Sequence, residues 1–256
     1  MTKHPGKYGT RKLNCLFPSS GMGTHLFNLV KDLFDLKHTY IISDFLNEDD
    51  SEMLLSQNWK LLKLEQILSQ ENDYVLGFLL WWPTILDEKI INKFKTGIVN
   101  FHPSYLPFGR GKDPYFWSIV NDEPFGISCH FIDKKIDSGS LIVQKRIDKD
   151  WTDTGETLRE KAIKELKLVI KVWVSKVIQS DYALEKIADL TVNYRKDMLN
   201  RSVVELDSQY TFREFLNLIR AKSNSDHTGV VFSDSDDRFH VKLQIEECSN
   251  GPNSKI

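Results

Sequence analysis

An amide and an imidazole stand two residues apart near the middle of the chain, at Asn100 and His102. The three residues before Asn100 are Gly-Ile-Val, an extended apolar run, and side chains two apart on a strand point to the same side. Pro103 and Pro107 then end regular structure and stiffen the chain. The sequence therefore predicts that Asn100 and His102 are presented side by side where a strand becomes a loop, a common position for active-site residues.

A carboxylate, Asp137, lies in a second loop and is followed by the turn residues Ser138 and Gly139. Close to His102 it would orient the ring and favour its protonated form.

The amide of Asn100, the imidazole of His102 and the carboxylate of Asp137 suit acyl transfer to an amine. Asn100 can donate to the oxyanion of a tetrahedral intermediate, worth about 3 kcal/mol of barrier. His102 can act as general acid or base, a role worth roughly 10²–10⁴ in rate. The spacing alone leaves open a second interpretation, a strand end with a hydrogen-bonded histidine and a plain turn.

The same residues belong to longer patterns. The chain reads Asn100-Phe-His102-Pro-Ser104-Tyr-Leu106-Pro107, then Arg110-Gly111, and later Asp137-Ser-Gly139. In combination these resemble the signature of the formyltransferases that use N10-formyltetrahydrofolate, a family that includes methionyl-tRNA, glycinamide ribonucleotide and sugar N-formyltransferases. The resemblance covers roughly residues 11 to 180. Tyr105 departs from it, because the family usually has Leu there. The resemblance implies Asn100, His102 and Asp137 as the catalytic residues, N10-formyltetrahydrofolate as co-substrate, and no metal.

Composition bounds the class of protein. The chain has 256 residues, 41% of them hydrophobic and 27% charged, which fits one domain or one large and one small domain. Its net charge of −2 gives no reason to expect a nucleic-acid partner. The cysteines Cys15, Cys129 and Cys248 are odd in number and lack metal-ligand spacing, so they indicate reduced thiols, and Cys15 and Cys129 lie in apolar runs typical of a core. With no signal peptide and no apolar run long enough to span a bilayer, we expect a cytoplasmic protein without a membrane partner.

Alternating patterns predict an α/β fold, a Rossmann-like, mostly parallel sheet with helices on both faces. Expected strands are residues 13–17, 40–43, 74–80 and 141–147, and expected helices are residues 26–34, 85–94, 114–120 and 154–178, with a short strand and helix in 61–68. Residues 47–52 are interpreted as an acidic surface loop and residues 181–190 as a short helix. A helix over 212–221 and two strands, 229–232 and 239–243, then form a small α+β tail with a β hairpin. We place the catalytic domain at residues 1–190 and the C-terminal region at 191–256.

A glycine-rich turn, with Gly21 and Gly23, follows the first predicted strand and begins a helix. Free N–H groups at such a helix start can hold a phosphate, and the alternative is a tight turn with a Ser or Thr cap. The segment is similar to the substrate-phosphate loop of glycinamide ribonucleotide formyltransferase. That resemblance assigns Gly21 and Gly23 to substrate binding, and whether this chain uses the loop for phosphate stays open.

The folate contacts rest on the resemblance as well. In the family, the loop that follows the buried strand 74–80 and the segment 131–133 contact the pterin, which implies Trp82, Ile132 and Asp133 here. A core role for the tryptophan is an equal alternative. Arg110 and Lys112 border the proposed site, so we assign Arg110 to the cofactor and Lys112 to the substrate, against the alternative of solvated surface cations.

The tail indicates the acceptor. It is shorter than the basic barrel with which methionyl-tRNA formyltransferases bind tRNA, and it resembles the tail of nucleotide-linked amino-sugar N-formyltransferases. That resemblance implies nucleotide contacts from Tyr194 and Arg195, a homodimer, and a dTDP-4-amino-4,6-dideoxyhexose acceptor of glucose configuration, made for O-antigen in lipopolysaccharide. The alternatives are methionyl-tRNA or glycinamide ribonucleotide as acceptor, and a catalytically silent folate- or nucleotide-binding module.

Overall fold

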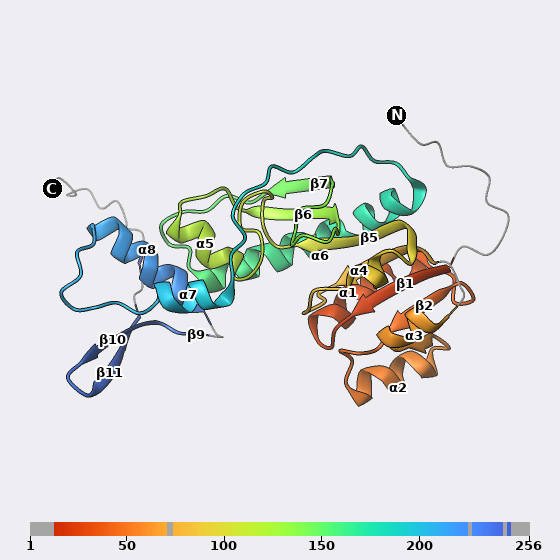
Figure 1. The fold of residues 1–256 in the computed structure, drawn as a ribbon, viewed down its shortest axis with the longest axis horizontal. Coiled ribbons are helices and arrows are strands. Elements are labelled where there is room, and N and C mark those ends of the chain that lie inside the picture. Colours follow the sequence, from red (N-terminus) through yellow and green to blue (C-terminus); the bar gives the residue numbers. More distant parts are fainter. Residues whose placement is uncertain (1–12, 71–73, 225–226, 243–244, 247–256) are drawn as a thin grey trace, which may run out of the picture. The chain divides into compact units, whose positions relative to one another are not determined.

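The computed structural model describes residues 13–70, 74–224, 227–242 and 245–246 (Figure 1). Within these residues, seven strands form one sheet in the order β3-β2-β1-β4-β5-β6-β7. The strands are β1 Leu13–Pro18, β2 Thr39–Ile42, β3 Lys60–Leu62, β4 Tyr74–Leu80, β5 Phe94–His102, β6 Gly126–Phe131 and β7 Leu141–Arg146. The pairs β1–β2, β1–β4, β2–β3 and β4–β5 are parallel. The predicted α/β class with a mostly parallel sheet is therefore confirmed.

Helices connect the strands. They are α1 Met22–Val30, a 3₁₀ turn η1 Lys31–Leu33, α2 Glu48–Ser56, α3 Leu64–Ser69, α4 Glu88–Ile91, α5 Pro114–Val120 and α6 Gly155–Gln179. The start of α6 agrees with the predicted Thr154 cap, because Thr154 Oγ1 accepts from the Thr157 backbone N–H and Thr157 Oγ1 accepts from that of Thr154. The described residues contain no helix that is long and apolar enough to span a membrane.

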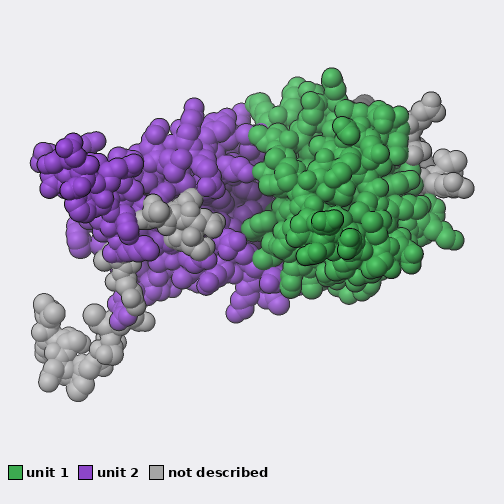
Figure 2. Space-filling model, turned by 90° about the horizontal axis from the view of Figure 1, so that it is seen from below, with its two compact units in different colours: residues 1–101, 129–135, 169–183 green, residues 102–128, 136–168, 184–256 purple. Residues whose placement is uncertain are grey.

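Contacts divide the chain into two compact units, coloured green and purple in Figure 2. Unit 1 comprises residues 1–101, 129–135 and 169–183, and unit 2 comprises residues 102–128, 136–168 and 184–256. The division falls inside strand β5, between Phe101 and His102.

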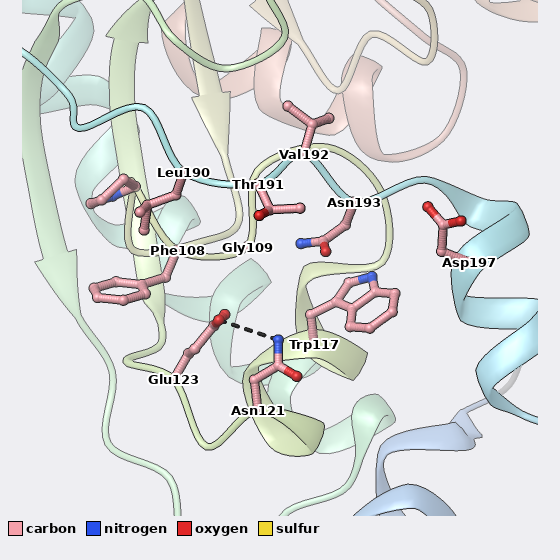
Figure 3. Close-up of a pocket in the computed structure, with 11 residues that line it drawn as sticks. Phe108, Gly109, Trp117, Asn121, Glu123, Leu190, Thr191, Val192, Asn193 and Asp197 are labelled. Atoms are coloured by element: carbon pink, nitrogen blue, oxygen red, sulfur yellow. Dashed lines mark hydrogen bonds between the residues drawn. The ribbon is translucent and has the colours of Figure 1, made fainter.

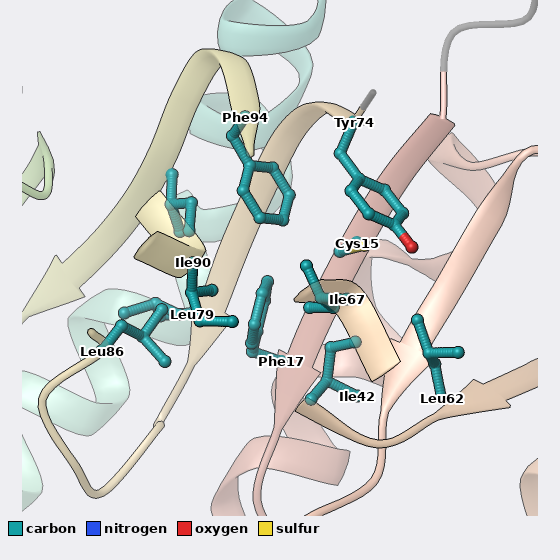
Figure 4. Packing of buried hydrophobic residues seen from close by; sticks show 11 residues of the cluster. Cys15, Phe17, Ile42, Leu62, Ile67, Tyr74, Leu79, Leu86, Ile90 and Phe94 are labelled. Atoms are coloured by element: carbon teal, nitrogen blue, oxygen red, sulfur yellow. The ribbon is translucent and has the colours of Figure 1, made fainter. Parts of the chain in front are cut away.

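The core of unit 1 joins side chains of strands β1 to β5 with those of helices α3 and α4 (Figure 4). Its buried members are Cys15, Phe17, Ile42, Leu62, Ile67, Tyr74, Leu79, Leu86, Ile90, Phe94 and Ile98. Each fully buried aliphatic or aromatic side chain stabilises the fold by roughly 1.5–3 kcal/mol. Cys15 and Cys129 are buried thiols, as predicted, and burial raises the pKa of both. Cys248 lies outside the described residues.

The acidic segment predicted as a loop is a helix. Helix α2 begins after Asn47, whose side chain accepts from the Asp50 N–H at 2.8 Å. Glu48, Asp49 and Asp50 fill the first turn, where carboxylates are stabilised by the positive end of the helix dipole. The three acidic residues therefore belong to the first turn of a helix and not to a surface loop.

Two predicted helices are wrong in extent or kind. Helix α4 covers only Glu88–Ile91 of the predicted 85–94, since Phe94 already pairs with Tyr74 in the sheet. Residues 181–190 form no helix. Glu185 instead exchanges two backbone hydrogen bonds with Leu141, of 2.8 and 3.0 Å, so tertiary pairing outweighs the local helical pattern there.

The C-terminal region has one helix more than predicted. Helix α7, Arg195–Arg201, is followed by α8, Phe212–Lys222, which begins at a Thr211 cap. Two short strands, β8 Ser223–Asn224 and β9 His227–Thr228, precede the predicted hairpin, which is β10 Val230–Asp234 paired with β11 Asp237–Val241. Phe232 and Phe239 stack across that hairpin, with ring centroids 5.3 Å apart.

Candidate active site

His102 is the last residue of β5 and is 8% exposed. Its Nε2 lies 3.0 Å from the carbonyl oxygen of Gly109. A carbonyl only accepts, so this nitrogen carries a hydrogen and donates it. The ring is thereby fixed by the loop that follows β5, as expected of a histidine presented at a strand end.

Asp137 reaches the same ring. Its Oδ2 lies 3.6 Å from His102 Nε2, and it accepts the backbone N–H of Gly111 at 2.8 Å. The residue has a positive φ of 44°, a conformation that Asp tolerates better than most side chains. His102 at a strand end and Asp137 in a second loop, as predicted, lie close together in unit 2. A carboxylate at this distance attracts the positive charge that the ring gains when it takes a proton.

Asn100 lies two residues before His102 on β5 and belongs to unit 1. Its Nδ2 is 3.4 Å from Nε2 of His130, a fully buried histidine on β6. Nδ1 of His130 is 2.8 Å from the carbonyl oxygen of Phe131, so Nδ1 carries the hydrogen and Nε2 accepts from the Asn100 amide. His130 thus orients that amide. Sequence reasoning missed it, although a histidine within an apolar strand was the available signal.

Arg110 is buried and hydrogen-bonded within the protein, and its assignment to the cofactor stays a prediction. Its side chain is 1% exposed, and its guanidinium donates to the Ile136 carbonyl, the Leu190 carbonyl and the Asp189 carboxylate. Four of its five N–H groups are engaged within the protein. Arg110 therefore has a structural role in the loop beside Asp137.

Three substrate residues predicted from distant parts of the sequence lie together in unit 2. The Lys112 N–H donates to the Asn193 carbonyl at 2.9 Å, next to Tyr194. Arg195 Nη2 contacts Asp113 Oδ1 at 3.1 Å. Lys112, Tyr194 and Arg195 are all exposed. Their assignment to the substrate stays a prediction.

A pocket of about 430 Å³ opens in this part of unit 2 (Figure 3). Its lining is Pro107, Phe108, Gly109, Trp117, Asn121, Glu123, Leu190, Thr191, Val192, Asn193 and Asp197. Figure 3 shows Asn193 and Trp117 approaching each other across it. Trp117 Nε1 is buried and has no hydrogen-bond partner among the described residues. A buried donor without an acceptor costs the fold roughly 1–3 kcal/mol. Because Gly109 lines the pocket and holds His102, the pocket borders the proposed catalytic ring.

The glycine turn of unit 1 has a packing role. Gly21 precedes α1 with φ 76°, and no side chain caps the helix, contrary to the Ser or Thr cap considered above. A Cβ on Gly23 would lie 2.5 Å from the Leu80 carbonyl oxygen, so only glycine fits. The phosphate role of Gly21 and Gly23 stays a prediction.

The predicted folate residues of unit 1 differ in exposure, because Trp82 and Ile132 are partly buried and Asp133 is exposed. Trp82 packs edge-on against Phe17 and Phe45, with centroids 5.5 and 4.6 Å away, and its Nε1 is buried with no partner in the described structure. Ile132 packs on the same core cluster. Asp133 is exposed. The described residues contain no cluster of three or more His, Cys, Asp or Glu side chains that could hold a metal.

Two segments of the chain match known protein families. Residues 63–172 match the Formyl transferase family, and residues 197–247 match the N-formyltransferase dimerization C-terminal domain. Over these two segments the comparison agrees with the resemblance to formyltransferases that the sequence predicts.

A dTDP-4-amino-4,6-dideoxyglucose formyltransferase of Mycobacterium tuberculosis is 28% identical over 150 residues, which cover 58% of this chain and 64% of that enzyme. The match thus spans less than two thirds of that relative. A 4-N formyltransferase from Francisella tularensis has the same fold, with a TM-score of 0.73 at 18% identity over 93% of this chain and 100% of that one. The N-formyltransferase from Helicobacter canadensis, in complex with folinic acid and dTDP-3-aminofucose, has a TM-score of 0.66 at 21% identity over 82% and 80%.

Proposed function

We propose that the protein transfers the formyl group of N10-formyltetrahydrofolate to the amino group of a nucleotide-linked amino sugar. One observation carries this proposal. A histidine held by a loop carbonyl and a carboxylate, His102 with Asp137, borders a 430 Å³ pocket and follows Asn100 on the same strand. The match of residues 63–172 to the Formyl transferase family supports the reaction class, and the folinic acid bound by the Helicobacter canadensis relative supports a folate donor.

Each catalytic side chain has one task in this proposal. The acceptor amine attacks the formyl carbon, and Asn100 donates its amide hydrogen to the oxygen that becomes negative, worth about 3 kcal/mol of barrier. His102 accepts the proton that the attacking nitrogen loses and returns a proton to N10 as the bond from the formyl carbon to N10 breaks. Asp137 keeps the ring oriented and balances its charge while it holds that proton.

The pocket is the proposed acceptor site. Its lining contains the carboxylates of Glu123 and Asp197 and no Lys or Arg, so it suits an uncharged ring with hydroxyl or carbonyl oxygens rather than a diphosphate. We assign the exposed Lys112 and Arg195, which lie beside the pocket-lining Asn193, to the phosphates of the acceptor. Trp82, Ile132 and Asp133 are kept as donor contacts from unit 1.

The finer identity rests on the relatives. The Mycobacterium tuberculosis relative favours dTDP-4-amino-4,6-dideoxyglucose as acceptor, and the Helicobacter canadensis complex shows that a related chain binds a 3-amino sugar. The dimerization domain matched by residues 197–247 supports a homodimer rather than a tRNA-binding barrel. We include in the proposal an O-antigen role and a cytoplasmic location, the latter supported by the reduced, buried Cys15 and Cys129.

Mass spectrometry of the acceptor tests the proposal. The protein is incubated with N10-formyltetrahydrofolate and, separately, dTDP-linked 4-amino and 3-amino dideoxyhexoses, their GDP- and UDP-linked counterparts, glycinamide ribonucleotide and methionyl-tRNA. We expect one added formyl group on a dTDP-amino sugar that requires both donor and enzyme, and no addition with His102→Asn. Formylation of methionyl-tRNA or glycinamide ribonucleotide alone would overturn the acceptor class. Binding without transfer to any acceptor would favour the silent binding module.

A further inference from the structure

We propose that Arg110 is a positioning residue that fixes the Asp137 loop and one wall of the acceptor pocket together, so that both are set by one buried guanidinium. The inference rests on the proposed function for the meaning of the pocket. Its structural part, the coupling of the two segments, stands on contacts within unit 2 alone.

One end of the guanidinium holds the carboxylate loop. Nε and Nη2 of Arg110 both donate to the carbonyl oxygen of Ile136, at 3.1 and 2.8 Å. Ile136 directly precedes Asp137, whose positive φ of 44° needs support from its surroundings. The paired hydrogen bonds fix the peptide from which the Asp137 side chain leaves.

The other end holds the pocket wall. Nη1 donates to the Leu190 carbonyl and to the Asp189 carboxylate, both at 2.8 Å. Leu190 begins the run of four residues, 190–193, that lines the pocket. This segment lacks regular structure apart from an isolated bridge at Asn193, so side-chain anchors define its path.

The backbone of the loop completes the connection. The Asn193 N–H donates to the Arg110 carbonyl, and the Lys112 N–H donates to the Asn193 carbonyl, both at 2.9 Å. Between these two bonds, the Gly111 N–H donates to Asp137 Oδ2 at 2.8 Å. A Cβ on Gly111 would overlap the Asn193 carbonyl, so glycine is needed for this close approach. Displacing the wall therefore displaces the group that holds the carboxylate.

Arginine suits this position and lysine does not. The two carbonyls lie at opposite ends of a planar group with donors in a fixed fork, whereas a lysine ammonium concentrates its three donors at one atom. At 1% exposure there is no solvent to replace a lost partner. Arg110→Lys keeps the positive charge and a side chain of similar size. Its ammonium can hydrogen-bond either to the Ile136 carbonyl or to the Leu190 segment, but not to both.

Two measurements on the full-length protein test the proposal, with Arg146→Lys as control, because Arg146 is exposed on β7. The first is residue-resolved amide hydrogen exchange without ligands. In Arg110→Lys we expect the Asn193 and Gly111 amides to exchange about tenfold faster, the effect of losing one hydrogen bond, with no change in the control. Unchanged exchange in a folded Arg110→Lys protein would overturn the coupling.

The second measurement is the steady-state kinetics. We expect kcat of Arg110→Lys to fall about 10²-fold with a raised KM for the acceptor, because misplacement of a catalytic group by about 1 Å has this effect, and an unchanged KM for the donor. Asp189→Asn, at a side chain 70% exposed, is the milder variant and is expected to raise the acceptor KM alone. Altered exchange with wild-type kcat and acceptor KM would overturn the positioning role. If the wild-type protein transfers formyl to no acceptor, the proposed function fails, while the exchange result still decides the coupling.

Discussion

At the scale of single residues, the proposed chemistry depends on a histidine at the end of strand β5 and a carboxylate in a separate loop. His102 and Asp137 contact each other at 3.6 Å, and no regular element holds Asp137. We expect His102→Asn and Asp137→Ala to lower kcat by roughly 10²–10⁴, since each removes a group that handles the proton or its charge. Steady-state assays with the identified acceptor measure this, and circular dichroism checks the fold. Asp148→Asn, an exposed carboxylate, serves as control. Near-normal turnover in either variant would refute the mechanism.

The orientation of Asn100 makes a second prediction at this scale. His130→Phe removes the acceptor for the Asn100 amide and the donor to the Phe131 carbonyl, at 3.4 and 2.8 Å in the native protein. Leaving buried polar groups unpaired costs roughly 1–3 kcal/mol of unfolding free energy, and we expect kcat to fall about tenfold. His130→Gln can accept and donate, so it should recover part of both losses. A wild-type kcat in His130→Phe would show that Asn100 does not need His130.

At the scale of elements, the two glycines of the turn between β1 and α1 are required for different reasons. A Cβ on Gly23 meets the Leu80 carbonyl at 2.5 Å, whereas a Cβ on Gly21 meets nothing within 4 Å but requires φ 76°. We expect Gly23→Ala to lower the unfolding free energy by about 1–3 kcal/mol and Gly21→Ala by about 1 kcal/mol, measured by urea titration. The smaller loss at Gly23 would show that the turn relaxes around the added methyl group.

Helices α7 and α8 enclose a lysine. Lys222 is 3% exposed, its Nζ contacts Met198 Sδ at 3.2 Å, and burial lowers its pKa below the usual 10.5 despite the opposing attraction of Asp113. The unfolded chain binds the Lys222 proton more tightly than the folded protein does. Below the pKa of Lys222 in the folded protein, the free energy of unfolding is therefore lowered. This destabilisation disappears as the pH rises toward 10.5. We expect Lys222→Met to raise the unfolding free energy at pH 7, with the gain shrinking at alkaline pH. A constant gain from pH 7 to 10.5 would contradict the titration of Lys222 as its cause.

Local patterns predicted the elements whose sequence and packing agree. The buried strands β1 and β4 and helices α5 and α6 were found because apolar periodicity and caps point to one structure. The pairing of His102 with Asp137 was predictable once the loops were matched to a family signature. Residues 181–190 were not predictable, because their hydrogen bonds go to Leu141 in a distant strand. The burial of Arg110 was not predictable for the same reason, since a sequence does not show that a cation is buried among carbonyl oxygens.

At the scale of the whole molecule, we expect a homodimer through the C-terminal region matched by residues 197–247. That region carries an exposed Phe212, 77% accessible, which a second copy could cover. Sedimentation equilibrium should show a dimer, and Phe212→Asp should raise its dissociation constant. Ile85→Asp changes a residue that is 72% exposed outside the matched region and should leave the dimer unchanged. A monomer at all concentrations, or equal effects of both variants, would contradict this assignment.

The division within β5 has a consequence for how the protein is inherited and made. Each compact unit is assembled from three separate stretches of the chain, and the boundary between Phe101 and His102 falls one residue after Asn100. No single cut in the gene yields either unit whole. A truncated coding sequence or a single exchanged gene segment would therefore deliver an incomplete unit.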